Sequence, residues 1–291
     1  MSQPPSVTLI AGPTASGKSA LALKMARETG AVIINADSQQ LYADLRILTA
    51  RPSEEDEALA EHRLYGFADA ADAWSVGRWS RAVQEVLKQE ADRPAILVGG
   101  TGLYFEALTR GLADIPDVPL DVRNETAAMY DEMGEIAFRT ALRGLDPQAE
   151  ARIEGGDRQR LVRAMSVWRA SGRSLSEWQA DTRPMLAPCT WKGLLLRPDR
   201  AALYVRCDAR TEWMMDAGAA AEVEILLSRK LSSDLPLMKA VGVRELGRYI
   251  DGLLGREEAA ASVKQATRNY AKRQMTWMRG RMADWSAPLL D

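Results

Sequence analysis

The sequence predicts an α/β fold in which helices flank a parallel sheet and an all-helical subdomain is inserted into the chain. Four short apolar runs indicate the sheet, because each is followed by glycine or polar residues and then by a helical pattern. Continuous apolar runs of this kind are typical of parallel strands that are buried on both faces. A long interval without a strand signal indicates the insertion. The runs are residues 7–11, 31–34, 95–98 and 193–196.

The first run leads into the most informative motif of the chain, which matches the phosphate-binding P-loop. A helix-forming stretch, residues 20–26, follows it, as the motif requires. Its glycines let backbone N–H groups converge on an anion, and the helix start adds a positive end. Lys18 supplies a positive charge, and the hydroxyl of Ser19 can hold a magnesium ion. A P-loop NTPase-like core that binds a diphosphate or polyphosphate is therefore predicted. The motif consists of Gly12, Pro13, Thr14, Ala15, Ser16, Gly17, Lys18 and Ser19.

The second and third runs place polar groups at the same edge of the sheet. Asp37 follows residues 31–34, and Thr101 follows residues 95–98. Ligands bind at the carboxyl ends of parallel strands, so we expect Gly12, Asp37 and Thr101 to face one cleft. From spacing alone, three roles stay open for Asp37: it could coordinate magnesium through water, cap a loop, or accept a hydrogen bond from a nucleophile as a general base.

The interval before the fourth run predicts a helical insertion, residues 116–190, within a catalytic core formed by residues 1–115 and 191–291. Prolines mark its ends, at positions 116, 119, 184 and 188. The C-terminal part of the core is expected to be mainly helical, with breaks at Gly218, Gly242 and Gly255.

Two helix starts are recognisable inside the insertion. Asp146 followed by Pro147 is typical of an N-cap and a proline in the first turn. A second helix is expected between Asp157, its N-cap, and Gly172, which ends it. Its apolar stripe comprises Leu161, Ala164, Met165 and Trp168. Its polar face carries Gln159, Arg160 and Arg163 and is either solvated surface or a binding face. The apolar Val167 is an exception on this polar face.

Charge and composition narrow the function classes. The net charge of −2 does not indicate a nucleic-acid binder, but residues 268–281 contain several basic residues and no acidic one. Such a stripe can grip phosphates, although it is more often a solvated helix face. The chain has a single histidine, His62, which disfavours a Ser-His-Asp triad or a histidine-rich zinc site. We expect His62 to be structural or on the surface. The basic residues are Arg268, Lys272, Arg273, Arg279 and Arg281.

The chain has no apolar run that could span a bilayer and no recognisable export signal at its start, so we expect a cytoplasmic protein without a membrane partner. In that setting Cys189 and Cys207 are expected to be reduced, unpaired and buried. Nothing in the sequence demands more than a monomer.

Phosphate binding leaves several chemistries open. The third run ends in Gly-Gly-Thr-Gly where a motor ATPase usually carries a magnesium-side aspartate. The residues alone favour a P-loop kinase that acts on a nucleoside or small metabolite with ATP, and a regulatory nucleotide-binding protein is a further alternative.

A set of motifs in fixed order closely resembles the bacterial tRNA dimethylallyltransferases, also called tRNA isopentenyltransferases, over nearly the whole chain. With this resemblance the transferase is favoured over the kinase. The chain departs from the family pattern at Arg51, Trp79 and Val243, where lysine, phenylalanine and an aromatic residue are usual, which bears on substrate preference or pocket shape. The motifs are residues 12–19, 35–42, 99–104, 159–164 and 267–277.

The resemblance implies a reaction. A dimethylallyl group moves from dimethylallyl diphosphate to N6 of the adenosine 3′-adjacent to the anticodon in tRNA, which forms N6-(dimethylallyl)adenosine and releases diphosphate. By the match, the P-loop holds the diphosphate, with Lys18 on the phosphates and Ser19 near Mg²⁺. Asp37 corresponds to the catalytic carboxylate, Thr101 lies beside the target base, and Arg206 and Arg210 lie near the diphosphate.

The resemblance also implies the surface that holds the anticodon stem-loop of tRNA. Some contacts come from the core and others from the insertion. The implied contact residues are Asp37, Ser38, Gln39, Gln40, Thr101, Arg123, Gln159, Arg160, Leu161, Val162 and Arg163.

Overall fold

The computed structural model describes residues 7–113 and 115–288. The chain divides into two compact units, one formed by Met1–Thr109 with Leu186–Asp291 and the other by Arg110–Met185. The amide of Leu186 donates to the carbonyl of Leu108 at 2.9 Å, so the chain leaves and re-enters the first unit at neighbouring points. These bounds lie a few residues before those marked by the prolines of the sequence. The first unit is the core below, and the second is the helical unit.

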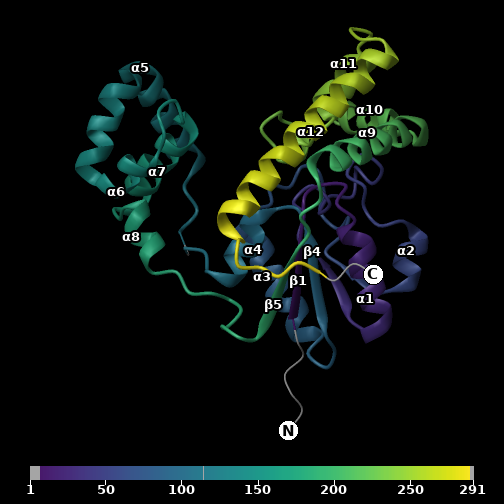
Figure 1. Cartoon of the computed structure of the whole chain (residues 1–291). Coiled ribbons are helices and arrows are strands. Elements are labelled where there is room, and N and C mark those ends of the chain that lie inside the picture. The colour runs from purple at the N-terminus through teal and green to yellow at the C-terminus, as the bar shows by residue number, and fades with distance from the viewer. Residues whose placement is uncertain (1–6, 114, 289–291) are drawn as a thin grey trace. The chain divides into compact units, whose positions relative to one another are not determined.

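The core is built on one parallel sheet with strand order β3-β2-β4-β1-β5 (Figure 1). The four predicted strands are confirmed, with bounds shifted by one or two residues in β2, β4 and β5. The short edge strand β3 was not predicted, because two residues carry no periodic pattern. The strands are β1 Val7–Ala11, β2 Val32–Asn35, β3 His62–Arg63, β4 Ala95–Gly99 and β5 Trp191–Leu195.

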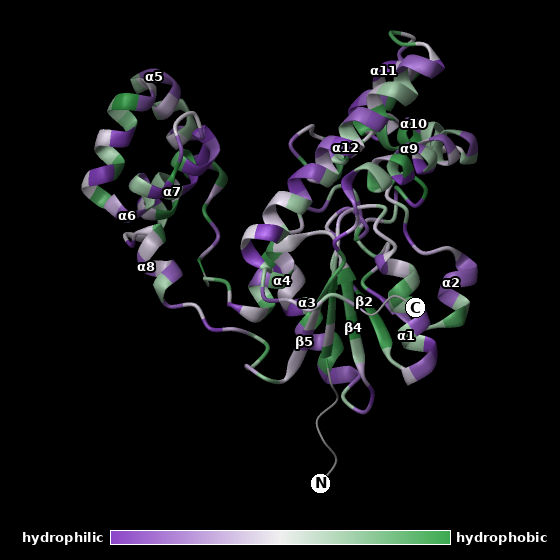
Figure 2. Ribbon diagram, viewed as in Figure 1, coloured by the Kyte–Doolittle hydropathy of each residue, from purple (hydrophilic) through white to green (hydrophobic). Residues whose placement is uncertain are grey.

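Apolar residues of the central strands make the core of this unit. Every residue of β1 and β4 is buried, and Figure 2 shows hydrophobic residues running along the strands. Helix α1 packs on the sheet through Ala22 and Ala26. The other helices that precede the helical unit are α2 Glu54–Leu59, α3 Val76–Gln89 and α4 Gly102–Thr109, and α1 spans Lys18–Thr29.

Helices of the C-terminal part lie over the edge at which the strands end (Figure 1). The predicted breaks are confirmed, because Gly218 ends one helix and Gly242 and Gly255 precede two others. This part comprises α9 Arg200–Ala217, α10 Ala219–Ser228, the 3₁₀ turn η1 Leu237–Lys239, α11 Val243–Ile250 and α12 Arg256–Arg281.

The helical unit has its own apolar core. Phe138 and Leu142 of α5 pack against Leu161 and Met165 of α7. Both predicted helix starts are confirmed: Asp146 accepts from the amide of Ala149 at 2.9 Å, and Asp157 caps α7. The unit comprises α5 Leu120–Leu145, α6 Pro147–Arg152, α7 Arg158–Ser171 and α8 Leu175–Ala180.

One expectation for α7 is corrected. Val167 was assigned to the polar face, but it is fully buried. Its neighbour Ser166 is buried as well, so the buried side of α7 is wider than one helical stripe. The reason is that α7 packs against both α5 and α8.

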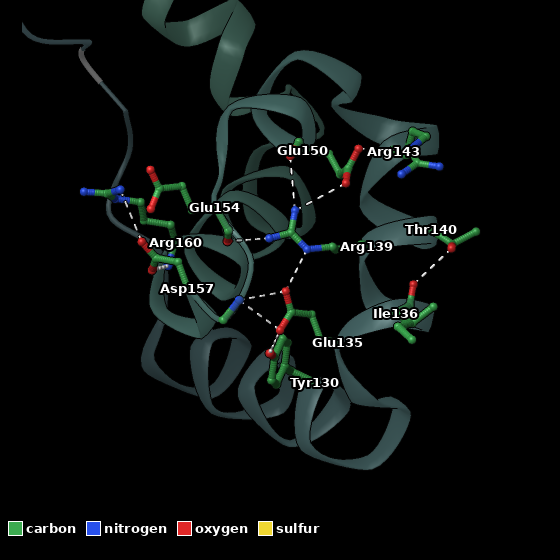
Figure 3. A network of polar contacts seen from close by, with 11 residues as sticks. Tyr130, Glu135, Ile136, Arg139, Thr140, Arg143, Glu150, Glu154, Asp157 and Arg160 are labelled. Carbon is green, nitrogen blue, oxygen red and sulfur yellow. Dashed lines mark hydrogen bonds and ion pairs between the residues drawn. The ribbon is translucent and has the colours of Figure 1, made fainter.

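An ion-pair network holds the turn that leads into α7 (Figure 3). Arg139 donates to Glu135 at 2.8 Å and pairs with Glu150 at 3.3 Å. Glu135 also accepts from the amide of Gly156 at 3.0 Å. The network therefore joins α5 to the residues that precede the N-cap of α7.

The cysteines agree with expectation only in part. Both are unpaired, and Cys207 is buried as expected, but Cys189 is exposed. It lies in the loop before β5 with a positive φ of 68°, and loops of this kind run over the surface. Across residues 7–113 and 115–288, none of the helices has the length and apolar content that a membrane crossing needs.

Candidate active site

The loop of residues 12–17, which the sequence predicts to bind a diphosphate and which is called the phosphate loop below, joins β1 to α1. Gly17 has a φ of 90°, which glycine adopts without strain, and it immediately precedes the first turn of α1. The amide of Ser16 donates to the carbonyl of Pro13 at 3.2 Å, which closes the turn. The hydroxyl of Ser16 is buried and bonds to no protein group. A buried polar atom without a protein partner calls for an explanation, and a bound anion would provide one.

Three cations gather at this loop. Lys18 donates to the carbonyl of Pro13 at 3.4 Å. Burial lowers the pKa of Lys18 to about 8; the charge of Asp37 opposes this shift, and that of Arg210 adds to it. From α9, Arg206 donates to the carbonyl of Ala15 at 2.9 Å, and Arg210 donates to the hydroxyl of Thr14. Burial also lowers the pKa of Arg210. Both arginines that the sequence singled out therefore contact the loop.

Asp37 follows β2 and is held rigidly. Its side chain is buried, and its carboxylate accepts from the amide of Gln39 at 3.1 Å. Its own amide donates to the side chain of Asn35 at 2.7 Å, and the Asn35 amide group donates back to the carbonyl of Asp37 at 3.0 Å. Trp79 of α3 donates from its indole to the carbonyl of Asn35 at 2.9 Å and stacks on Tyr104 at 4.0 Å. These contacts hold the backbone of Asp37, and the bond from Gln39 orients its carboxylate.

Thr101 joins the ends of β2 and β4. Its hydroxyl accepts from the amide of Ser38 at 3.0 Å and lies 3.3 Å from the Ser38 hydroxyl. Its amide lies 3.3 Å from the carbonyl of Ala36, to which it donates. Thr101, which follows β4, is thus hydrogen-bonded to the turn that follows β2.

Groups from the phosphate loop and from β2 line one small polar cavity of about 30 Å³. Thr14, Asp37 and Arg210 all contribute to its wall, together with Gln39 and Tyr270. A larger and mainly apolar cavity of about 300 Å³ lies beside Pro13, between the end of β5 and α12. We take the smaller one as the candidate reaction site, because it brings a carboxylate and a cation together next to the phosphate loop.

Gln274 of α12 connects parts of the site that are far apart in the chain. Its side-chain oxygen accepts from the amide of Thr14 at 2.8 Å, and its side-chain nitrogen donates to the carbonyl of Gly100 at 3.0 Å. Sequence reasoning assigned no role to Gln274, Asn35 or Trp79. The available signal was a polar residue in an otherwise buried helical stripe, since Gln274 lies between Ala271 and Met278.

Other residues predicted to bind tRNA differ in what they present. Gln40 donates to the carbonyls of Thr49 and Ala50 at 2.8 Å, so it braces that turn. In the helical unit, Gln159 and Arg160 are exposed, and Arg160 pairs with Asp157 at 3.2 Å.

The remaining contact candidates of the helical unit differ in burial, because Leu161 and Val162 pack in or against its core whereas Arg123 and Arg163 are exposed. Leu161 is fully buried there, so its side chain is not available to RNA. Val162 is partly buried against the same core. Arg123 donates to the carbonyl of Val118 at 3.0 Å. Partial burial and the charge of Arg123 lower the pKa of Arg163.

His62 agrees with a structural role. It lies in the edge strand β3, its Nδ1 is 2.8 Å from the carbonyl of Ala60, and its ring packs edge-on against Tyr65.

A family model described as IPP transferase matches residues 40–281. A curated tRNA dimethylallyltransferase of Caulobacter sp. (strain K31) is 57% identical over 281 residues, which cover 96% of this chain and 91% of the relative. Another, of Phenylobacterium zucineum (strain HLK1), is 56% identical and covers 97% of this chain and 92% of the relative.

Solved structures agree with this likeness. A tRNA isopentenylpyrophosphate transferase from Bacillus halodurans matches with a TM-score of 0.68 at 29% identity, over 97% of this chain and 89% of that one. A eukaryotic dimethylallyltransferase acting on tRNA matches with a TM-score of 0.81 at 22% identity, over 94% and 70%. At that lower identity, the second match shows the fold alone.

Proposed function

The chain belongs to the IPP transferase family, and we propose that it transfers a dimethylallyl group from dimethylallyl diphosphate to N6 of the adenosine 3′-adjacent to the anticodon in tRNA. The activity named for its close relatives, tRNA dimethylallyltransferase, supports the transfer to tRNA and gives no support to an ATP-dependent kinase. The observation that carries the assignment of roles is one cavity lined by Thr14 of the phosphate loop, Arg210 and the buried carboxylate of Asp37.

The phosphate loop is suited to a leaving diphosphate. Negative charge develops on the diphosphate as the C–O bond of the donor breaks, and preorganised amides and cations stabilise that charge most effectively in a site shielded from water. Lys18, Arg206 and Arg210 supply the cations. The loop therefore acts on the leaving group, which departs with the electron pair of the C–O bond.

Asp37 is suited to the acceptor. The exocyclic amine of adenine is a weak nucleophile, because its lone pair is delocalised into the ring. A carboxylate within hydrogen-bond reach orients the amine and takes its proton as the new C–N bond forms. The rigid bonding of Asp37 to Asn35 and Gln39 fixes the direction of this acceptor. Thr101 lies next to it and would contact the base.

A magnesium ion fits the oxygen donors at the loop only if substrate phosphates and water supply most of its ligands. Among the residues described, no cluster of three or more acidic, histidine or cysteine side chains could hold a metal. Mg²⁺ usually keeps several waters and binds through substrate phosphates with few protein ligands. The exposed Ser19, in the first turn of α1, provides one such oxygen. When bound there, the ion would add charge stabilisation to the diphosphate.

The anticodon loop suits this chemistry, because a base in a single-stranded loop is unstacked at low cost. Gln159 and Arg160 on the exposed side of α7 and the exposed Lys272 and Arg279 of α12 offer positive and polar groups to the RNA backbone. Arg268 of the same helix is paired with Asp208 at 2.8 Å. Phosphate contacts of this kind supply affinity rather than sequence selection.

The proposal is tested with unmodified tRNA, magnesium and labelled dimethylallyl diphosphate, followed by nucleoside analysis. We expect label in N6-(dimethylallyl)adenosine at the position that follows the anticodon. A parallel reaction with labelled ATP and nucleosides should transfer no phosphate. Phosphoryl transfer in that reaction, with no prenylated nucleoside in the first, would refute the proposal.

A further inference from the structure

We infer that Gln274 is a positioning residue for the transfer reaction, which fixes the phosphate loop against the turn that carries Thr101 and lies beside Asp37. The inference rests on the proposed function. It adds to the site a side chain of α12, an element that otherwise offers basic residues to RNA.

The side chain of Gln274 is buried and bonded at both ends. Its oxygen accepts from the amide of Thr14 and its nitrogen donates to the carbonyl of Gly100, at 2.8 and 3.0 Å. Only 6% of the residue is exposed. A buried amide with both ends paired is held in one orientation, because leaving either buried partner unpaired would be unfavourable.

Gly100 allows the amide and the catalytic carboxylate to approach the same point. A Cβ atom at Gly100 would lie 2.2 Å from Nε2 of Gln274 and 3.2 Å from Oδ2 of Asp37. Any side chain there would displace one of them. Tyr270, one turn earlier on α12, lies close to both Gln274 and Thr101, and burial raises the pKa of its hydroxyl.

These contacts span the two halves of the reaction. Thr14 belongs to the loop that would hold the donor, whereas Gly100 and Thr101 belong to the turn where the base would be received. Group transfer depends on holding the donor carbon and the acceptor nitrogen at a near-attack distance, and a misplacement of about 1 Å can cost 10²-fold in rate. A side chain that bonds to both halves sets this spacing.

The first test replaces the amide with an apolar group of similar length, Gln274→Met. We expect kcat to fall about 10²-fold, while the affinities for dimethylallyl diphosphate and tRNA stay close to those of the unaltered protein. Gln265→Met is the matched control: Gln265 lies on the same helix, is exposed, and bonds only to Asn269 and Arg268 of that helix. An unaltered kcat would overturn the inference. A fall in kcat that is fully explained by a smaller fraction of protein able to bind dimethylallyl diphosphate would overturn it as well.

The second test, Gln274→Glu, decides the matter if the methionine variant does not fold. It keeps the size of the side chain and the acceptor for the Thr14 amide, but it loses the donor to Gly100 and adds an acid beside Asp37. The charged and titratable groups that already face Asp37 are Lys18, Arg210, Tyr65, Tyr104 and Tyr270. A second carboxylate favours the protonated form of Asp37, so we expect the acid limb of the kcat profile to move to higher pH.

Gln265→Glu should leave that limb in place. A Gln274→Glu variant with the original kcat and pH profile would refute the inference. The unaltered protein separates the two claims. If it transfers no dimethylallyl group, the proposed function fails, whereas an active protein whose Gln274 variants are equally active refutes the positioning role alone.

Discussion

At the level of single residues, opposite charges meet across one cavity. Arg210 and Asp37 both line this cavity, and both of their charges act on the buried Lys18. Their burial has a chemical consequence. A lysine in water has a pKa of about 10 and stays charged near neutral pH. The lower pKa of the buried Lys18 makes its charge sensitive to pH in the range just above neutrality.

The shifted lysine predicts a pH-dependent affinity for the donor. With a pKa of about 8, Lys18 of the free protein is charged below that pH and neutral above it. Bound diphosphate favours the charged form, so the affinity for dimethylallyl diphosphate should be highest below about pH 8 and fall, by up to about tenfold per pH unit, as the pH rises through it. Calorimetric titration over this range measures the effect.

Lys18→Arg is the control for that prediction. Arginine stays charged throughout this range, so the pH limb should disappear in the variant. If Lys18→Arg shows the same limb as the unaltered protein, another group is responsible.

A second prediction concerns Asp37. Asp37→Asn keeps the shape of the side chain and its acceptor for the Gln39 amide, but it removes the base. We expect kcat to fall about 10²–10⁴-fold, with the affinity for tRNA unchanged. Asp234→Asn, in an exposed pair with Lys239 at 3.2 Å, should leave kcat as it was. Steady-state transfer assays with both variants are sufficient, and an active Asp37→Asn variant would remove Asp37 from the mechanism.

At the level of elements, helix termini and helix faces supply the groups of the candidate site and of the proposed RNA contacts. Helix α1 begins at the phosphate loop, α9 supplies two arginines to it, and α12 supplies Gln274. In the helical unit, α7 buries Leu161, Met165 and their neighbours and leaves Gln159 and Arg160 exposed. The network around Arg139 fixes the turn that precedes α7 (Figure 3).

The exposed side of α7 predicts the salt dependence of tRNA binding. Arg160→Gln combined with Arg163→Gln should weaken binding and reduce the slope of log K against log salt concentration by about 1 for each arginine. Filter binding at several salt concentrations measures it. Arg143→Gln is a matched control, since Arg143 lies in the same unit and pairs with Glu150 at 2.9 Å. If the unaltered protein, the double variant and Arg143→Gln all show the same slope, α7 has a structural role and does not contact RNA phosphates.

At the level of the whole molecule, two units with separate apolar cores share one chain. The groups proposed to handle the diphosphate and the base amine lie within the core, whereas several residues proposed to hold tRNA lie in the helical unit. The hydrogen bond between Leu186 and Leu108 brings the two connections together at the core.

This division predicts that the two binding functions are separable. Replacement of residues 110–185 by a short flexible linker should leave a folded core that binds dimethylallyl diphosphate as before. Its affinity for tRNA should fall and depend less on salt, because Arg123, Arg160 and Arg163 are removed. Calorimetry with the donor and filter binding with tRNA measure the two parts. Unchanged tRNA affinity would contradict the assignment of RNA contacts to the helical unit.

The sequence alone determined the four longer strands, the turn of the predicted phosphate loop and the capped helices, because these depend on neighbours in the chain. A continuous apolar run, a glycine at a positive φ, or an aspartate before a proline acts over a few residues, and each of these patterns was confirmed. Tertiary structure decided which distant groups meet. Gln274 reaches Thr14, Trp79 reaches Asn35, and α7 buries Val167, because long-range packing selects partners that no local pattern specifies.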